Sequence, residues 1–332
     1  MILAVGLNVR VFEPLSMSFD TCDRVSPECP VEYTLYGDFF TLGATATYAA
    51  IFGGFLTAQV PLTLRAKTWS YGAWLAAGTA FECIGYICRC VMSQNPWNYD
   101  AFIGQYLCLV LGPTLAAAAI SLTFKHLVIW FGVEYSLIRP GLYPWVFVGT
   151  DFISICIQAA GGGIASASTS GSTLGNNLLL AGVCFQVVNM VFCGGLILAY
   201  VWRRRRALSS GSAGTADDYA STDSEVPPCW QGSSELVRRN GRNVRIFVWG
   251  LVVAYITIVI RCTYRIPEMT LGWGSTLMQN EATFMSLDGA MLIIACGALT
   301  ACHPAFFFSF MGRNSKGKLT NASEFELISG NQ

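Results

Sequence analysis

The chain has 332 residues, of which 53% are apolar and only 12% are charged. Soluble proteins carry about twice that share of charged residues, and the mean hydropathy of +0.49 also argues against a soluble protein. Most of the chain is therefore expected to lie in a lipid bilayer. The 20 basic and 20 acidic residues balance, which excludes a generally basic nucleic-acid-binding protein, and no nucleic acid is expected as a partner.

Seven stretches are long and apolar enough to cross a membrane as helices, which takes about 20 residues each. In chain order they cover roughly residues 39–60, 69–92, 102–124, 142–164, 177–202, 244–266 and 284–306. They predict an all-α membrane protein, a bundle of seven transmembrane helices. Residues 1–9 are apolar but few, with no basic start and no small-residue cleavage site, so we do not expect a signal peptide.

Lysines and arginines are distributed unevenly between the two sides of the predicted bundle. One side carries Arg10 and Arg24. The other side carries the basic residues between the spans or at their ends, namely Arg65, Lys67, Lys125, Arg139, Arg203 to Arg206, Arg238, Arg239, Arg242, Arg245, Arg313, Lys316 and Lys318. Because cytosolic loops are enriched in basic residues, we expect an exoplasmic amino terminus and a cytosolic carboxyl terminus.

The spans divide the chain into five parts. These are an exoplasmic segment (1–38), helices one to five (39–202), a basic and partly disordered cytosolic loop (203–243), helices six and seven (244–310) and a cytosolic tail (311–332). Basic clusters at both ends of the loop favour contact of residues 203–245 with anionic membrane lipids. The alternative is a stop-transfer signal followed by a plain linker.

Motifs that would indicate a pump or an enzyme are missing. Residues 312–319 have the spacing of a phosphate-binding loop, but Leu319 replaces the required Ser or Thr, and a membrane helix precedes the motif instead of a strand. The two histidines, His126 and His303, are too few for a three-histidine zinc hydrolase. We expect no ATP site, no metal, no cofactor and no enzymatic activity.

Ten of the thirteen cysteines lie within the predicted spans, where a cysteine behaves as a small apolar residue. Cys22 and Cys29 differ, because they lie close together in the exoplasmic segment, on the oxidising side of the membrane. We expect them to form a disulfide. Cys229, in the cytosolic loop, is expected to be free.

Ionisable and amide residues recur inside the predicted spans at a spacing of seven residues. Each charge costs about 2.5–3.5 kcal/mol at a helix centre, so these residues are expected to have a role. Seven residues make nearly two helical turns, which puts both members of a pair on the same side. The pairs are Glu82 and Arg89, Asp151 and Gln158, Arg261 and Glu268, and Glu281 and Asp288, with Arg265 beside Arg261.

These stripes are expected to converge on one cavity in the exoplasmic half of the bundle. Three embedded acids balance three embedded bases, as pairing would require. The pairs could serve only as interhelical ion pairs that fix the packing. The number of polar groups favours a hydrated site for an amphiphile. Three glycines, Gly161 to Gly163, follow Gln158 and predict a break in the fourth span.

Several strings that contain these residues resemble the fungal lipid-translocating exporters, the RTA-like family that includes a sphingoid long-chain base exporter. The strings are Y-G at Tyr36, E-C-I-G-Y-I-C-R from Glu82, F-V-G-T-D-F-I-S-I-C-I-Q-A-A-G-G-G from Phe147, R-C-T-Y-R-I-P-E from Arg261, E-A-T-F-M-S-L-D from Glu281 and H-P at His303. The Cys22 to Cys29 segment is similar to the family's exoplasmic cysteine pair. Gly112 departs from the family, which usually has Ala there.

The resemblance implies a protein of the plasma membrane, or of the vacuolar or another internal membrane, that is linked to movement of amphiphilic lipids or to stress resistance. Our leading hypothesis is a transporter or translocase for a sphingoid base or a sterol-like lipid. In it, Glu82, Asp151 and Asp288 meet a positive head group, while Arg89, Arg261 and Arg265 hold those acids or meet a phosphate. A buried carboxylate such as Glu82 or Asp151 would carry protons if transport uses them.

A second hypothesis is a seven-helix receptor or a stress or lipid sensor that signals through the basic cytosolic loop. The span count and the exoplasmic amino terminus fit this alternative. Against it, the third span ends in Phe124, Lys125 and His126, where many such receptors have a D-R-Y-like triplet. The residues therefore favour transport, and protein partners stay open.

Overall fold

The computed structural model describes residues 22–131, 135–138, 141–167, 173–209, 241–271 and 275–304. These residues are nearly all helical and contain no strand beyond an isolated bridge between Ser26 and Cys29. Seven helices are long and apolar enough to span a membrane. The predicted fold class, an all-α seven-helix membrane protein, is confirmed.

Six crossings are single helices: α1 (Leu42–Ala66), α2 (Trp69–Met92), α3 (Tyr99–Phe131), α4 (Leu142–Ala167), α5 (Thr173–Ser209) and α7 (Gly241–Thr270). The seventh consists of α9 (Glu281–Phe284), the π-helical turn η4 (Met285–Ala290) and α10 (Met291–Ala301). Two short elements, η1 (Val31–Tyr33) and α8 (Thr276–Gln279), precede α1 and α9. The helices extend several residues beyond most predicted spans, whereas α2 has the predicted bounds.

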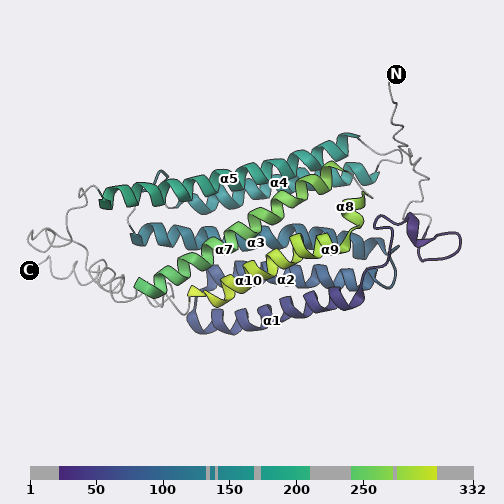
Figure 1. Cartoon of the computed structure of the whole chain (residues 1–332), viewed down its shortest axis with the longest axis horizontal. Coiled ribbons are helices and arrows are strands. Elements are labelled where there is room, and N and C mark those ends of the chain that lie inside the picture. Colours follow the sequence, from purple (N-terminus) through teal and green to yellow (C-terminus); the bar gives the residue numbers. More distant parts are fainter. Residues whose placement is uncertain are drawn as a thin grey trace, which may run out of the picture.

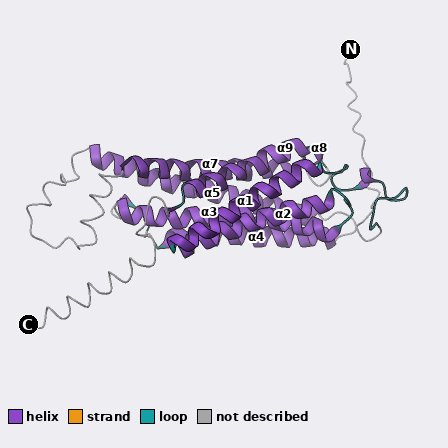
Figure 2. Cartoon of the chain, turned by 90° about the horizontal axis from the view of Figure 1, so that it is seen from below, coloured by secondary structure: helices purple, strands orange, loops and turns teal. Residues whose placement is uncertain are grey.

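The helices follow one another around the bundle in chain order, and α10 closes the ring against α1 (Figure 1). In the view from below they lie along one common direction, with the described loops at the two ends (Figure 2). Helix α7 runs obliquely across the bundle and also meets α3. This crossing between α3 and α7 brings the polar faces of several helices together.

Local signals explain where the helices begin and end. Lys67, in the left-handed conformation at φ 54°, ends α1. The side chain of Ser275 caps α8 by accepting from Met278 N, and that of Asn280 caps α9 by accepting from Thr283 N.

Many large apolar side chains face outward and several charged ones are buried, unlike the pattern of a soluble protein. Trp145, Leu198 and Phe152 are 78%, 70% and 64% exposed, while Arg89 and Asp288 are fully buried. A water-soluble monomer rarely exposes apolar surface on this scale. The outer surface of the helices therefore fits a lipid environment.

Aromatic residues close the bundle at both ends. We call the end where α2 and α7 finish and α3 and α9 begin the disulfide end, because Cys22 and Cys29 lie there. Phe40, Met92 and Ala101 pack together at this end. At the opposite end, Phe124, Tyr143 and Tyr200 belong to a second cluster between α3, α4 and α5.

One expectation about the fourth span is wrong. Helix α4 does not break at Gly161 to Gly163 but continues to Ala167. A Cβ atom on Gly161 would lie 2.6 Å from the backbone nitrogen of Leu179 in α5. Glycine is needed here because α4 and α5 pack closely, as small residues allow between membrane helices.

The basic loop lies mostly outside the described residues. Arg203 to Arg206 continue α5 as its last turns, and the guanidinium of Arg206 lies 5.4 Å from the Trp202 ring centroid. Residues 210–240, which include Cys229, and the tail from residue 305 lie outside the described parts. The proposed contact with anionic lipid stays a prediction.

Candidate functional site

Asp288 is the centre of a buried ion-pair network. Its Oδ1 atom lies 3.1 Å from Arg261 Nε and 3.0 Å from Arg265 Nη2. Arg265 also donates from Nη1 to Glu268 Oε2 at 3.0 Å. Two arginines and two carboxylates thus form a group without net charge. Buried charges require such pairing, because each loses its hydration.

A proline supplies one further partner for Arg261. In an α-helix each carbonyl accepts from the N–H four residues later, but proline has no N–H. Pro113 in α3 therefore leaves the carbonyl of Leu109 without its helical donor. Arg261 Nη2 donates to that carbonyl. The network on α7 is in this way joined to the interior of α3.

The π-helical turn η4 sets the position of Asp288. A π-turn holds more residues than an α-turn and often occurs at functional sites. Tyr48 Oη donates to the carbonyl oxygen of Met285, the first residue of this turn, at 3.0 Å. The turn also changes the angular spacing between Glu281 and Asp288, so a separation of seven residues no longer puts them on one side.

Glu82 is a buried carboxyl without a hydrogen-bond partner among the described residues. Its exposed fraction is 1%, and neither Oε1 nor Oε2 accepts a hydrogen bond. The carboxyl lies against Gly112 of α3, where a Cβ atom would be 2.2 Å from Oε1. Gly112 is one turn from Leu109, the residue that Arg261 contacts. An unpaired buried carboxyl favours its neutral acid form.

Arg89 is buried against aromatic rings instead of an acid. Its guanidinium carbon lies 3.9 Å from the ring centroid of Phe40, 4.2 Å from that of Phe284 and 5.8 Å from that of Tyr36. Within the described chain, Arg89 forms no ion pair, and its Nε and Nη1 atoms have no hydrogen-bond partner. Ring faces attract cations, so the three rings stabilise this charge.

A small cavity borders the network on the side of α4 and α5. Its volume of about 20 Å³ has room for about one water molecule. Gln158 Nε2 donates to Gln186 Oε1 at 3.1 Å on one wall. The cavity is lined by Tyr106, Val110, Gln158, Val183, Gln186, Arg261, Cys262, Arg265 and Met269.

We call the cavity and its buried polar surroundings the polar chamber. Its members are Glu82, Gln158, Gln186, Arg261, Arg265, Glu268 and Asp288. They come from α2, α4, α5, α7 and η4. Helices α2, α4 and α7 contact α3, and α5 and η4 contact α7. The structure thus brings together most of the residues that the heptad spacing singled out.

Three sequence candidates lie apart from the polar chamber. Arg89 lies among the rings of Tyr36, Phe40 and Phe284, which we call the aromatic box. Asp151 accepts a hydrogen bond from Asn189 Nδ2 at 2.9 Å, between α4 and α5. Glu281 lies at the first turn of α9, where it accepts from Thr41 N and, at 2.8 Å, from Thr41 Oγ1. Glu281 therefore ties α9 to the start of α1.

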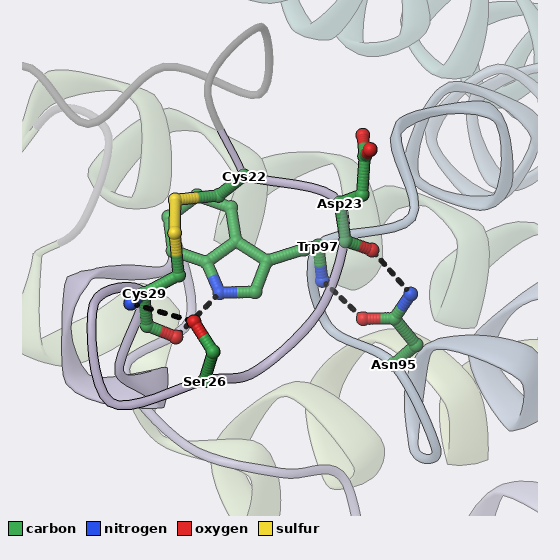
Figure 3. Close-up of a disulfide and its surroundings, with 6 residues drawn as sticks. All are labelled: Cys22, Asp23, Ser26, Cys29, Asn95 and Trp97. Atoms are coloured by element: carbon green, nitrogen blue, oxygen red, sulfur yellow. Dashed lines mark hydrogen bonds between the residues drawn. A yellow bond between two sulfur atoms is a disulfide. The ribbon is translucent and has the colours of Figure 1, made fainter.

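The segment before α1 lies against the disulfide end. Cys22 and Cys29 form a disulfide, and the indole of Trp97 lies beside it (Figure 3). Trp97 Nε1 donates to Cys29 O at 3.3 Å, and Asn95 Nδ2 donates to Asp23 O at 2.8 Å (Figure 3). The loop between α2 and α3 thus holds this segment in place.

Further along the segment, Gly37 turns the chain with φ at 71°, a conformation that favours glycine. On either side of this turn, Tyr36 and Phe40 pack over Arg89. Gln105 Nε2 donates to Tyr36 Oη at 3.1 Å. Burial raises the pKa of the Tyr36 hydroxyl above its ordinary value, although Arg89 opposes the shift. The hydroxyl is neutral at physiological pH.

The spacing analysis missed the aromatic box and the role of Pro113. The box is formed by residues on three separate segments, and no local pattern joins them. The role of Pro113 could have been predicted from the sequence, because Leu109 and Pro113 are four residues apart within one predicted span. A proline inside a membrane helix always frees a carbonyl, and a buried arginine needs acceptors.

Comparisons with known proteins agree with this architecture. The model of the family described as RTA1 like protein matches residues 75–311. The sphingoid long-chain base transporter RSB1 of Saccharomyces cerevisiae is 29% identical over 298 residues, which cover 86% of this chain and 77% of that one. Protein RTM1 of the same organism is 37% identical over 128 residues, 38% of this chain and 41% of that one.

Protein RTA1 of Saccharomyces cerevisiae is 33% identical over 111 residues, 33% of this chain and 35% of that one. No solved structure matches the chain. The family model covers well over half of the residues, including the strings around Glu82, Asp151, Arg261 and Asp288. The chain belongs to the RTA1-like family.

Proposed function

We propose that this protein moves amphiphilic lipids with a cationic head group, of the sphingoid base type, across a membrane. The plasma membrane is the expected location. The name of the Saccharomyces cerevisiae relative, a sphingoid long-chain base transporter, supports this substrate class. Named transporters among the relatives also fit a protein that is not an enzyme.

The observation that carries the proposal is the polar chamber. Five charged and two amide side chains from five helical elements lie together, all of them buried except the partly buried Arg265, while the outer surfaces of the same helices carry large exposed apolar side chains. Ion pairs that only fix the packing have no need for the unpaired Glu82 or for a cavity beside the network. A polar head group would find hydrogen-bonding partners here, while its chain stays in lipid.

The conformation described is closed. A cavity of about 20 Å³ has room for a water molecule but not for a lipid head group, so the helices must separate during transport. Among the ion pairs of the described residues, all lie within α7 or between α7 and η4. Separation of α4 and α5 from α7 would break none of them, and we infer that the head group enters on this side.

A sterol-like substrate is the second candidate within the same class. A sterol has a single neutral hydroxyl, which needs one donor or acceptor such as Gln158 or Gln186. It brings no positive charge to pair with an ionised carboxyl. Glu82 therefore favours a cationic head group over a sterol.

The proposal is tested by reconstitution of the purified protein into vesicles with sphinganine, a phospholipid and a sterol as separate probes. Transfer between leaflets is measured by extraction with external albumin or cyclodextrin. We expect the wild-type protein to transfer sphinganine fastest. Glu82→Gln and Asp151→Asn are expected to lower this transfer about tenfold or more, the effect of losing one charge-assisted contact, with unchanged protein levels in the membrane.

Glu28→Gln provides the matched control, because Glu28 is exposed and belongs to the segment before α1, outside the polar chamber. This variant should transfer sphinganine as the wild type does. Equal transfer by the wild type, Glu82→Gln and Asp151→Asn would refute the proposed role of these acids. Transfer of the sterol but not of sphinganine would show that the substrate is sterol-like and not a sphingoid base.

A further inference from the structure

The charges around Glu82 can be counted. Arg261 and Arg265 balance Glu268 and Asp288. Arg89 and Asp151 lie apart from the polar chamber and stay outside this count. Glu82 therefore decides the net charge of the polar chamber, which is zero when its carboxyl is neutral and one negative when it is ionised.

A proton and a monovalent cation have the same effect on this net charge, because each neutralises the ionised Glu82 carboxyl. If a cationic head group binds to ionised Glu82, the net charge is again zero. If it binds while Glu82 keeps its proton, a buried site carries one uncompensated positive charge, which is costly. Binding of the head group and of the proton should thus exclude each other.

Among the described residues near Glu82, the other acids already have partners, so none of them replaces Glu82 in this exchange. The charged side chains that act on it are Arg261, Arg265 and Asp288, and these are paired with one another or with Glu268. Cys108 from α3 and Cys296 from α10 lie near. Tyr86 lies one turn after Glu82 on α2, and its ring centroid is 5.2 Å from that of Tyr48 on α1.

We propose that Glu82 exchanges one proton for the single positive charge of an ammonium amphiphile, so that lipid and proton cross the membrane in opposite directions. When the lipid arrives, the O–H bond of the Glu82 carboxyl breaks and the proton passes to water on that side. The carboxylate then pairs with the ammonium group. At the other face a proton from water displaces the lipid. This inference rests on the proposed function and adds its driving force.

The test uses vesicles that contain the full-length protein and an internal pH-sensitive dye. The probe is N,N,N-trimethylsphinganine, whose charge is permanent, so that it cannot carry a proton itself as a free amine can. Lipid transfer is followed by albumin extraction in parallel with the internal pH. N-acetylsphinganine, which has no charge, serves as the neutral probe.

For the wild-type protein we expect one proton to move in the opposite direction for each trimethyl lipid, and no proton movement with the neutral probe. Glu82→Gln should reduce both lipid and proton movement about tenfold or more. The control Glu28→Gln should behave as the wild type. An imposed proton gradient should accelerate lipid transfer by the wild type and have no effect on Glu82→Gln.

The outcomes separate the two proposals. Transfer of the trimethyl lipid without proton movement would overturn the exchange and leave the proposed function intact. Failure of the wild type to transfer any probe would overturn the proposed function and the exchange with it. Glutamine resembles the neutral acid in size, so Glu82→Gln should also unfold at the wild-type temperature. A variant that fails to fold would contradict a neutral Glu82 at rest.

Discussion

Two residues on one face of α2 accommodate their burial in opposite ways. Arg89 keeps its charge, because the rings of Phe40 and Phe284 lie against its guanidinium. Glu82, two turns earlier, has no hydrogen-bond donor among the described residues. A charge that is stabilised in place is a structural element, while a carboxyl without partners is available to a proton or a ligand. We therefore assign the chemistry to Glu82.

Gly112 provides the space that Glu82 occupies. A Cβ atom at this position would lie 2.2 Å from Glu82 Oε1, and the end of a flexible glutamate can move away from it. Gly112→Ala should thus keep the fold and displace the carboxyl. An overpacked contact costs about 1–3 kcal/mol, and we expect this cost to appear in the affinity for sphinganine, measured as KM in vesicles.

The same variant should change the preference among head groups, because the displaced Glu82 carboxyl would meet a bound head group at a different position. Gly112→Ser would displace Glu82 in the same way and offer it a donor. An unchanged KM in both variants would show that the position of Glu82 does not matter for binding.

At the scale of the helix, two irregularities serve the network. Pro113 frees the Leu109 carbonyl in α3, to which Arg261 donates, and the turn η4 positions Asp288 for both arginines. Both are costs to helix stability, since proline costs about 3 kcal/mol in a helix interior relative to alanine. Helices with regular hydrogen bonding could not hold the network in this form.

Pro113→Ala tests whether Pro113 lowers the stability of α3 and at the same time supports the contact of Arg261 with the Leu109 carbonyl. The alanine restores an N–H that competes with Arg261 for the Leu109 carbonyl, so we expect a higher unfolding temperature in detergent and slower lipid transfer. Pro61→Ala in α1 is the matched control, because Pro61 also lies inside a membrane helix but away from the network. Loss of transfer in both variants would attribute the effect to helix geometry in general.

At the scale of the molecule, the sequence was sufficient for the fold. Hydropathy alone located seven spans, because a bilayer requires about 20 apolar residues for each helix. The spacing of polar residues within the spans was enough to predict that one group of side chains lies together, namely Glu82, Gln158, Arg261, Arg265, Glu268 and Asp288. It failed for Arg89, Asp151 and Glu281, which lie apart from the polar chamber. For Glu281 the reason is the π-turn η4, which shifts the helical period between Glu281 and Asp288. A spacing rule assumes regular helices.

The sequence was insufficient for contacts between distant segments. Phe40 and Phe284 meet at Arg89 although more than 200 residues separate them, and nothing in either local string indicates the encounter. The three glycines of α4 were interpreted as a break, but Gly161 serves close packing against α5. Glycine permits both outcomes, and the neighbouring helix decides between them.

The central claim is that a cationic head group binds within the polar chamber. It is tested most directly by photo-crosslinking with a trimethylsphinganine that carries a diazirine next to the head group, followed by mass spectrometry of the labelled peptides. We predict adducts on chamber-lining residues such as Tyr106 and Met269, which Glu82→Gln strongly reduces. Adducts confined to the outer surface, on residues such as Phe152 and Trp249, and unaffected by Glu82→Gln would contradict the claim.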